Sequence, residues 1–168
     1  CLRPAPGRME LYQQGSSPRV VVDYAHTPDA LEKALLSVKR HCAGELWCVF
    51  GCGGDRDAGK RPEMAAVAEK IADKIIVTDD NPRFEDPKKI IDDILAGFKF
   101  LNKVKVIHER ADAIASALND ADKHDLILVA GKGHETWQEV KGERIFFSDI
   151  NEVKQCIDTI ERRAQKKF

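Results

Sequence analysis

The sequence predicts an α/β domain with a Rossmann-like three-layer sandwich. In this fold a mostly parallel sheet carries helices on both faces, with an antiparallel strand contribution. Three observations predict it. Strand-like runs alternate with helical patterns of crossover length. The apolar runs are almost continuous, as is typical of strands buried on both faces. Polar segments, two of them rich in glycine, follow the strand-like runs, where ligands bind in open α/β sheets.

The first elements are expected to be a hairpin and a helix. Strand patterns at residues 8–13 and 19–24 flank the turn residues 15–18, which indicates an antiparallel pair. Thr27 has the side chain of a helix N-cap, and Pro28 suits the first helical position. The sequence therefore predicts that a helix follows the hairpin directly.

The remaining elements follow from the same periodicities. Further strands are expected at residues 46–51, 74–78, 104–108 and 126–130, with a strand pair around 141–143. Further helices are expected to begin at Pro62 and Pro87, then to carry Ile114, Ala117 and Leu118, and finally Val153, Cys156, Ile157 and Ile160. Strands and helices alternate throughout, so the connections should be right-handed crossovers.

Composition excludes several classes of protein. At 168 residues the chain fits one domain. The net charge is −1 and no basic stripe occurs, which argues against a nucleic-acid partner. No apolar run approaches the roughly 20 residues that cross a bilayer, so no membrane association is expected. The five cysteines are odd in number and lack C-x-x-C spacing, which favours a reduced, cytoplasmic protein without a metal site.

The ends of the chain have a different character from the middle. Residues 1–7 include Pro4, Pro6 and Gly7 without a strand or helix pattern, which is typical of an interdomain linker. Residues 164–168 are expected to be a frayed tail. The folded domain is therefore expected to span residues 8–163.

Polar residues collect in the segments that leave the predicted strands. These segments are residues 23–28, 51–57, 78–83, 108–110 and 131–135. The carboxyl ends of parallel strands meet at one edge of a sheet, so these segments should surround one site. The connections expected at the opposite edge, such as residues 119–123, have the composition of plain solvent-exposed turns.

Three other sites fit this sequence poorly. Residues 54–60 match the start of a phosphate-binding P-loop, but Arg61 replaces the hydroxyl residue that binds magnesium. Residues 51–56 do not complete the dinucleotide-binding glycine pattern either, because Arg56 occupies its last position. A phosphoacceptor domain would use Asp23, Asp79 and Lys132, but it would leave the arginines of these segments without a role.

The charges in these segments suit a zwitterion such as an amino acid. Arg56 and Arg83 are planar forks for carboxylates, whereas Asp80, Asn81 and Glu135 can hold an ammonium group. Pro82, between Asn81 and Arg83, restricts the backbone and preorganises both side chains. A single arginine or glutamate would be read as a surface ion pair. Their concentration after the strands favours a binding site instead.

Five motifs in order resemble those of the Mur ligase family, over residues 6 to about 149. They are Pro6-Gly7-Arg8-Met9-Glu10, Val22-Asp23-Tyr24-Ala25-His26-Thr27-Pro28, the loop 51–57, Asp80-Asn81-Pro82-Arg83 and Gly131-Lys132-Gly133-His134-Glu135. Each motif alone is weak, but the ordered set is specific. The chain resembles only the C-terminal domain of these ligases, and the resemblance implies that the ATP-binding and UDP-sugar-binding domains lie outside it.

The resemblance implies a function for the domain and roles for its residues. It is most similar to the ligases that use ATP and Mg²⁺ to add meso-diaminopimelate to UDP-N-acetylmuramoyl-L-alanyl-D-glutamate through an acyl phosphate. ATP, Mg²⁺ and the UDP precursor would bind mainly to the other domains, so this domain alone is expected to be inactive and to hold no catalytic residue. By resemblance, the diaminopimelate-binding residues are Arg56, Asp80, Asn81, Pro82, Arg83, Gly131 and Glu135. By resemblance, Arg8, Asp23 and His26 contact ATP.

Two alternatives remain open at this stage. The same scaffold could add L-lysine, although relatives that do so lack the arginine that corresponds to Arg83. The chain could also be a freestanding amino-acid-binding module.

Overall fold

The computed structural model describes residues 7–167 and contains a six-stranded sheet. Its strands are β1 (Glu10–Tyr12), β2 (Arg19–Asp23), β3 (Leu46–Phe50), β4 (Lys74–Val77), β5 (Val104–Val106) and β6 (Leu126–Ala130). Their order is β1-β2-β6-β3-β4-β5, and only the β1–β2 pairing is antiparallel. The predicted fold class and the N-terminal hairpin are both confirmed.

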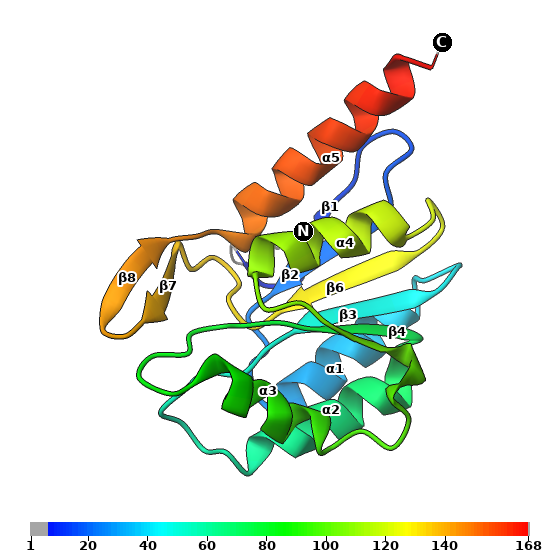
Figure 1. Ribbon diagram of the computed structural model, residues 1–168. Helices are drawn as coiled ribbons and strands as arrows, with labels where there is room; N and C mark the ends of the chain where they lie inside the picture. Colours follow the sequence, from blue (N-terminus) through cyan, green and yellow to red (C-terminus); the bar gives the residue numbers. More distant parts are fainter. Residues whose placement is uncertain (1–6, 168) are drawn as a thin grey trace.

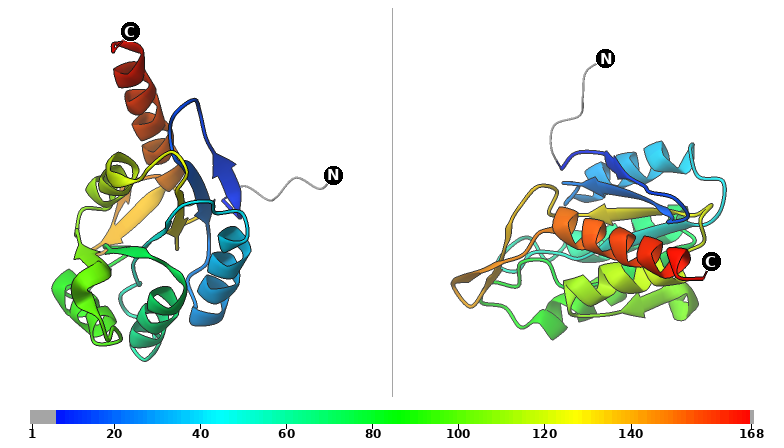
Figure 2. Two further views of the ribbon diagram at one scale, coloured as in Figure 1. Left: turned by 90° about the vertical axis from the view of Figure 1, so that its right-hand side faces the viewer. Right: turned by 90° about the horizontal axis from the view of Figure 1, so that it is seen from above.

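Helices cover both faces of this sheet (Figures 1 and 2). The helices on one face are α1 (Pro28–Lys39), α2 (Lys60–Ile71) and α3 (Pro87–Leu95), and those on the other are α4 (Arg110–Asp120) and α5 (Asp149–Gln165). A short 3-10 helix, η1 (Leu101–Lys103), precedes β5. Among the described helices, none combines the length and the apolar character needed to cross a membrane.

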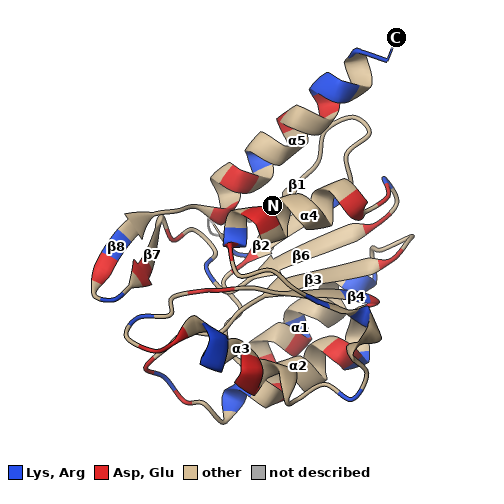
Figure 3. Cartoon of the chain, in the orientation of Figure 1, with Lys and Arg blue, Asp and Glu red and all other residues tan. Residues whose placement is uncertain are grey.

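Alternation along the central strands produces two cores, one on each side of the sheet. In β6, Leu126, Leu128 and Ala130 pack with the α1–α3 layer, whereas Ile127 and Val129 pack with the α4–α5 layer. Strands β3 and β6 are fully buried and carry no charged residue, as Figure 3 shows. Burial on both faces thus explains why these runs are continuously apolar.

Most predicted helix starts agree with the structure, and one differs. Thr27 caps α1 by accepting a hydrogen bond from the Ala30 amide. The helix predicted to begin at Pro62 begins two residues earlier, at Lys60. Proline is tolerated there because the first four amides of a helix have no intrahelical acceptor.

A two-stranded sheet stands apart from the main sheet. Its strands β7 (Trp137–Val140) and β8 (Glu143–Phe146) form the predicted pair around residues 141–143. This hairpin projects from the body of the domain on the side where β6 ends (Figure 1). Helix α5 continues to Gln165 and includes the first two residues of the segment expected to be a tail. The linker prediction falls almost entirely on residues 1–6, which lie outside the described residues.

Candidate amino-acid-binding site

A cavity of about 460 Å³ lies at the carboxyl edge of the parallel strands. Six of the seven residues predicted to bind the amino acid line it, and they are Arg56, Asp80, Asn81, Arg83, Gly131 and Glu135. The seventh, Pro82, is buried between Asn81 and Arg83. Of the residues predicted to contact ATP, His26 lines the cavity, whereas Arg8 and Asp23 do not. The structure therefore brings together side chains that lie far apart in the sequence.

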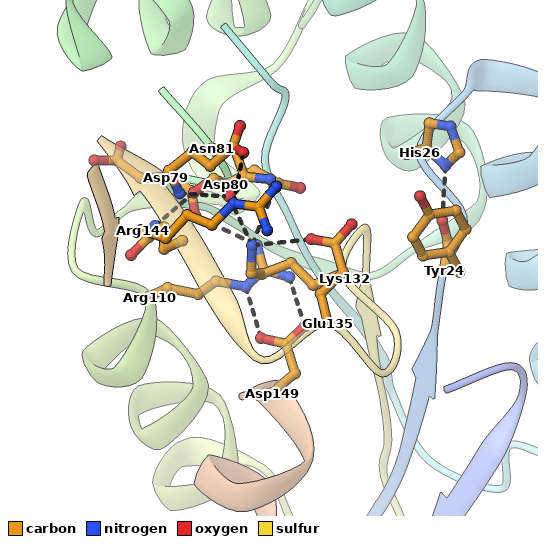
Figure 4. A network of polar contacts seen from close by, with 12 residues as sticks. Tyr24, His26, Asp79, Asp80, Asn81, Arg110, Lys132, Glu135, Arg144 and Asp149 are labelled. Atoms are coloured by element: carbon orange, nitrogen blue, oxygen red, sulfur yellow. Dashed lines mark hydrogen bonds and ion pairs between the residues drawn. The ribbon is translucent and has the colours of Figure 1, made fainter. Parts of the chain in front are cut away.

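Lys132 is completely buried beneath this cavity. Its Nζ donates to Asn81 Oδ1 at 2.8 Å and to Glu135 Oε2 at 3.3 Å, and lies 3.6 Å from Asp80 Oδ1 (Figure 4). Two carboxylates and one amide oxygen thus surround a single cation. The formal charge of Asp80, Lys132 and Glu135 together is −1, which leaves this wall suited to a ligand ammonium group.

Gly131 is required where β6 meets the Asp80 side chain. Its φ of +121° is unfavourable for other residues, and a Cβ atom at this position would lie 2.7 Å from Asp80 Oδ2. The absence of a side chain at residue 131 therefore allows the Asp80 carboxylate to approach the end of β6.

Arg83 is held in the left-handed region, with a φ of +54°. Its Nε donates to Glu139 Oε2 at 2.9 Å, and its Nη1 donates to the Gly54 carbonyl at 2.9 Å. Gly53 leaves room for the guanidinium, because a Cβ there would lie 2.8 Å from Nη1. Among the hydrogen bonds within residues 7–167, none uses Nη2 of Arg83, so part of the fork remains for a carboxylate.

A buried arginine, Arg61, supports the glycine-rich loop of residues 51–57. Arg61 is 1% exposed and forms ion pairs with Glu85 and Asp93, each at 2.9 Å. Its Nη2 also donates to the Gly53 carbonyl at 3.1 Å, which ties the glycine loop to α2 and α3. Arg56 itself is exposed at the cavity and is therefore accessible to a ligand.

The residues predicted to contact ATP lie near one another at the β2 end of the cavity. Both Asp23 carboxylate oxygens accept backbone hydrogen bonds, from Met9 at 2.9 Å and Ala25 at 2.8 Å. The Tyr24 ring contacts His26 edge-on and lies beneath the Arg8 guanidinium at 5.6 Å. Asp23 thus fixes the loop, while Arg8 and His26 stay exposed.

Arg110 forms a buried connection behind the site. Its Nε and Nη2 donate to the Asp149 carboxylate at 2.7 and 2.8 Å, and both side chains are 0% exposed (Figure 4). Nη2 also donates to the Ala130 carbonyl at 3.0 Å. Burial disfavours the charged guanidinium, but the carboxylates of Asp149, Asp80 and Glu135, with Asp149 the largest contributor, more than offset this and raise the pKa of Arg110. The pair joins α4 and α5 to the end of β6.

Within residues 7–167, no group of three or more His, Cys, Asp or Glu side chains is arranged to hold a metal ion. The four cysteines of that range carry free thiols. Cys52 lines the cavity, and burial raises its pKa to about 12, so its thiol stays protonated at neutral pH.

Sequence reasoning missed several residues that build the site. The sequence placed Lys132 in the motif of residues 131–135 and in a possible phosphoacceptor triad, but predicted no contact for it at the site. The structure shows instead that the Asp79 carboxylate contacts His108 Nδ1 at 2.8 Å, whereas Lys132 contacts Asp80, Asn81 and Glu135. Arg61, Arg110 and Glu139 carried no motif signal. Both Arg61 and Arg110 lie in the first turn of a helix, on its buried face, just before the helices as the sequence predicted them. Their helical spacing to the apolar residues that follow is the pattern that could have indicated a buried ion pair.

The fold and the cavity define an α/β domain with a polar cavity of mixed charge at the carboxyl edge of its sheet. The family described as "Mur ligase, glutamate ligase domain" matches residues 7–133 of the chain. The chain therefore belongs to the Mur ligase family, and corresponds to its C-terminal domain.

Individual relatives agree with this assignment. UDP-N-acetylmuramoyl-L-alanyl-D-glutamate–2,6-diaminopimelate ligase of Haemophilus influenzae is 59% identical over 148 residues, which are 88% of this chain and 30% of that protein. A solved structure of a ligase with the same name has a TM-score of 0.88 at 46% identity, covering 95% of this chain and 33% of the other. Folylpolyglutamate synthase of Thermotoga maritima gives 0.57 at 26% identity, covering 76% and 28%. The chain thus spans about a third of the length of these relatives.

Proposed function

We propose that this chain is the domain that binds the incoming amino acid in a ligase that adds meso-diaminopimelate to UDP-N-acetylmuramoyl-L-alanyl-D-glutamate. The observation that carries the proposal is the charge pattern of one cavity. Arg56 and Arg83 provide cations for carboxylates, whereas Asp80 and Glu135 provide a negative wall for ammonium groups. The identity to diaminopimelate ligases supports the choice of amino acid.

Arg83 is the proposed selector for diaminopimelate. Diaminopimelate carries a second carboxylate at the end of its side chain, and lysine does not. The unoccupied part of the Arg83 fork suits that group, while Arg56, Asn81, Gly131 and Glu135 complete the site. A buried charged hydrogen bond of this kind contributes about 1.5–3 kcal/mol. L-Lysine should therefore bind much more weakly.

The proposed chemistry is peptide-bond formation in the cytoplasm through an acyl phosphate. ATP transfers its γ-phosphoryl group to the D-glutamyl carboxylate, and the ligand amine then attacks the acyl carbon and phosphate leaves. The other domains of the ligase would bind Mg²⁺, most of ATP and the UDP precursor. This domain would place the amine, and Arg8, Asp23 and His26 would contact ATP from across the interdomain cleft. No catalytic residue is assigned to this chain, which is expected to be inactive alone.

An NMR titration of the domain tests the proposed site. Adding meso-diaminopimelate should shift the signals of Arg56, Asn81, Arg83 and Glu135, and L-lysine at the same concentration should not. Arg83→Ala is the matched variant, and it should remove the diaminopimelate response. Equal responses to both amino acids would contradict selection by Arg83, and shifts confined to residues outside the cavity would contradict the site itself.

A further inference from the structure

The hairpin β7–β8 lies behind the whole segment Asp80–Arg83. Gln138 Nε2 donates to the Asp80 carbonyl at 2.6 Å, and the Glu139 amide donates to Asn81 Oδ1 at 3.0 Å. The Arg83 amide donates to the Glu139 carbonyl at 2.9 Å, and the Lys141 amide donates to the Arg83 carbonyl at 2.8 Å. Strand β7 therefore acts as a template for the segment that carries the proposed selector, although it lies beyond the family match at residues 7–133.

One side chain of this hairpin touches the Arg83 guanidinium. The Glu139 carboxylate accepts from Arg83 Nε at 2.9 Å, and the two side chains are only 24% and 22% exposed. Its other oxygen lies 3.3 Å from Nε of Arg144, which stacks over the Trp137 ring at 4.7 Å. The two Glu139 oxygens thus contact different arginines, Arg144 through one oxygen and Arg83 through the other.

This arrangement fixes the direction of the Arg83 fork. An arginine side chain has several rotatable bonds, and its bidentate contact with a carboxylate needs one orientation of the guanidinium plane. Glu139 occupies Nε and the Gly54 carbonyl occupies one N–H of Nη1, so only the cavity-facing remainder can meet a ligand. Without Glu139, a single side-chain hydrogen bond would hold the guanidinium.

We propose that Glu139 is a positioning residue that sets the selectivity of the site by orienting Arg83 toward the distal carboxylate of the amino acid. The inference rests on the proposed function, because it assumes that Arg83 binds this carboxylate. Glu139 touches neither the reacting amine nor ATP in this scheme. Its loss should therefore weaken amino-acid binding without changing the chemical step.

The test is steady-state kinetics of the full-length ligase that contains this domain, with Glu139→Ala, Glu139→Gln and the control Glu143→Ala. Glu143 lies on the same hairpin, is exposed, and makes no side-chain hydrogen bond or ion pair within the described residues. Glu139→Ala should raise KM for meso-diaminopimelate about tenfold, with kcat and KM for ATP within about twofold. Glu139→Gln keeps an acceptor for Nε and should stay within about twofold of the parent, as should Glu143→Ala.

A double-mutant cycle separates positioning from a general structural role. In an Arg83→Ala background, Glu139→Ala should have no further effect on KM for diaminopimelate, because the side chain that it orients is gone. An equal tenfold loss in that background would overturn the inference, and so would a Glu139→Ala variant that behaves like Glu143→Ala. If Arg83→Ala itself leaves diaminopimelate use unchanged, the proposed function fails instead.

Discussion

Two completely buried cations lie at the same edge of the sheet, and they differ in what surrounds them. Arg110 forms its ion pair with one carboxylate, Asp149, which is as buried as the arginine itself. Lys132 faces Asp80, Asn81 and Glu135, all of which line the cavity. Arg110 and Asp149 form a neutral pair, whereas Lys132 has two carboxylate partners, and both of these also line the proposed ligand site.

The difference shows how one edge of the sheet can carry both a structural ion pair and a charged cluster that lines the cavity. A neutral buried pair has no charge left for a ligand, and its role is to join α4, α5 and β6. The Lys132 cluster keeps one net negative charge at the cavity, which a ligand ammonium group can neutralise. We therefore expect Arg110 to govern stability alone, and Lys132 to govern both stability and binding.

The largest expected effect is that of Arg110→Met on stability. This change leaves Asp149 charged and without its partner in the interior, which should lower the free energy of unfolding by about 3–5 kcal/mol. Urea denaturation followed by circular dichroism measures it. The double variant Arg110→Met/Asp149→Leu removes both charges and should recover much of the loss. A single variant within 1 kcal/mol of the parent would contradict the assigned role.

A somewhat smaller loss is expected for Lys132→Met, about 2–4 kcal/mol, because its partners are in part open to the cavity and can be hydrated. Unlike Arg110→Met, it should also abolish the NMR response to meso-diaminopimelate, since Asn81 and Glu135 lose their common anchor. Lys89→Met, on the exposed face of α3, is the control and should change stability by less than about 0.5 kcal/mol. Retained diaminopimelate binding in a folded Lys132→Met variant would show that the two cations do not differ as proposed.

The fold was predictable because its signals are local. Continuous apolar runs identified β3 and β6, and Thr27 with Pro28 marked the start of α1. The start of α2 was misplaced by two residues, because Pro62 is equally acceptable at the first or the third helical position. The order of the strands required the structure, since it depends on packing between distant segments.

The cavity-lining residues that directly follow predicted strands could be predicted from the sequence. Arg56, Asn81, Arg83 and Glu135 were expected to meet, and they line one cavity. The supports of these side chains could not be found in this way. Lys132, Arg61 and Glu139 act through partners that lie between 3 and 56 positions away in the chain, and charge alone does not distinguish such residues from surface ones.

The smallest expected effect concerns Asp79, which precedes the cavity residue Asp80 but faces His108 instead. Burial raises the pKa of Asp79 above 3.8, although His108 and Arg110 act in the opposite direction. The folded protein therefore holds this proton more tightly than the unfolded chain does. As pH rises from 3.8 through the higher folded pKa, the contribution of Asp79 to stability falls, and it stays low at neutral pH.

Asp79→Asn removes this titration and should flatten the pH dependence. Relative to the variant, the parent should lose unfolding free energy between pH 4 and pH 7, as measured by urea denaturation. A His108→Gln background excludes titration of the histidine as the cause, and Asp158→Asn on the exposed face of α5 is the control. A constant difference between parent and variant at both pH values would mean that Asp79 is not buried enough to matter. The comparison between the buried Arg110–Asp149 pair and the Lys132 cluster at the cavity would then depend only on the Arg110 and Lys132 variants.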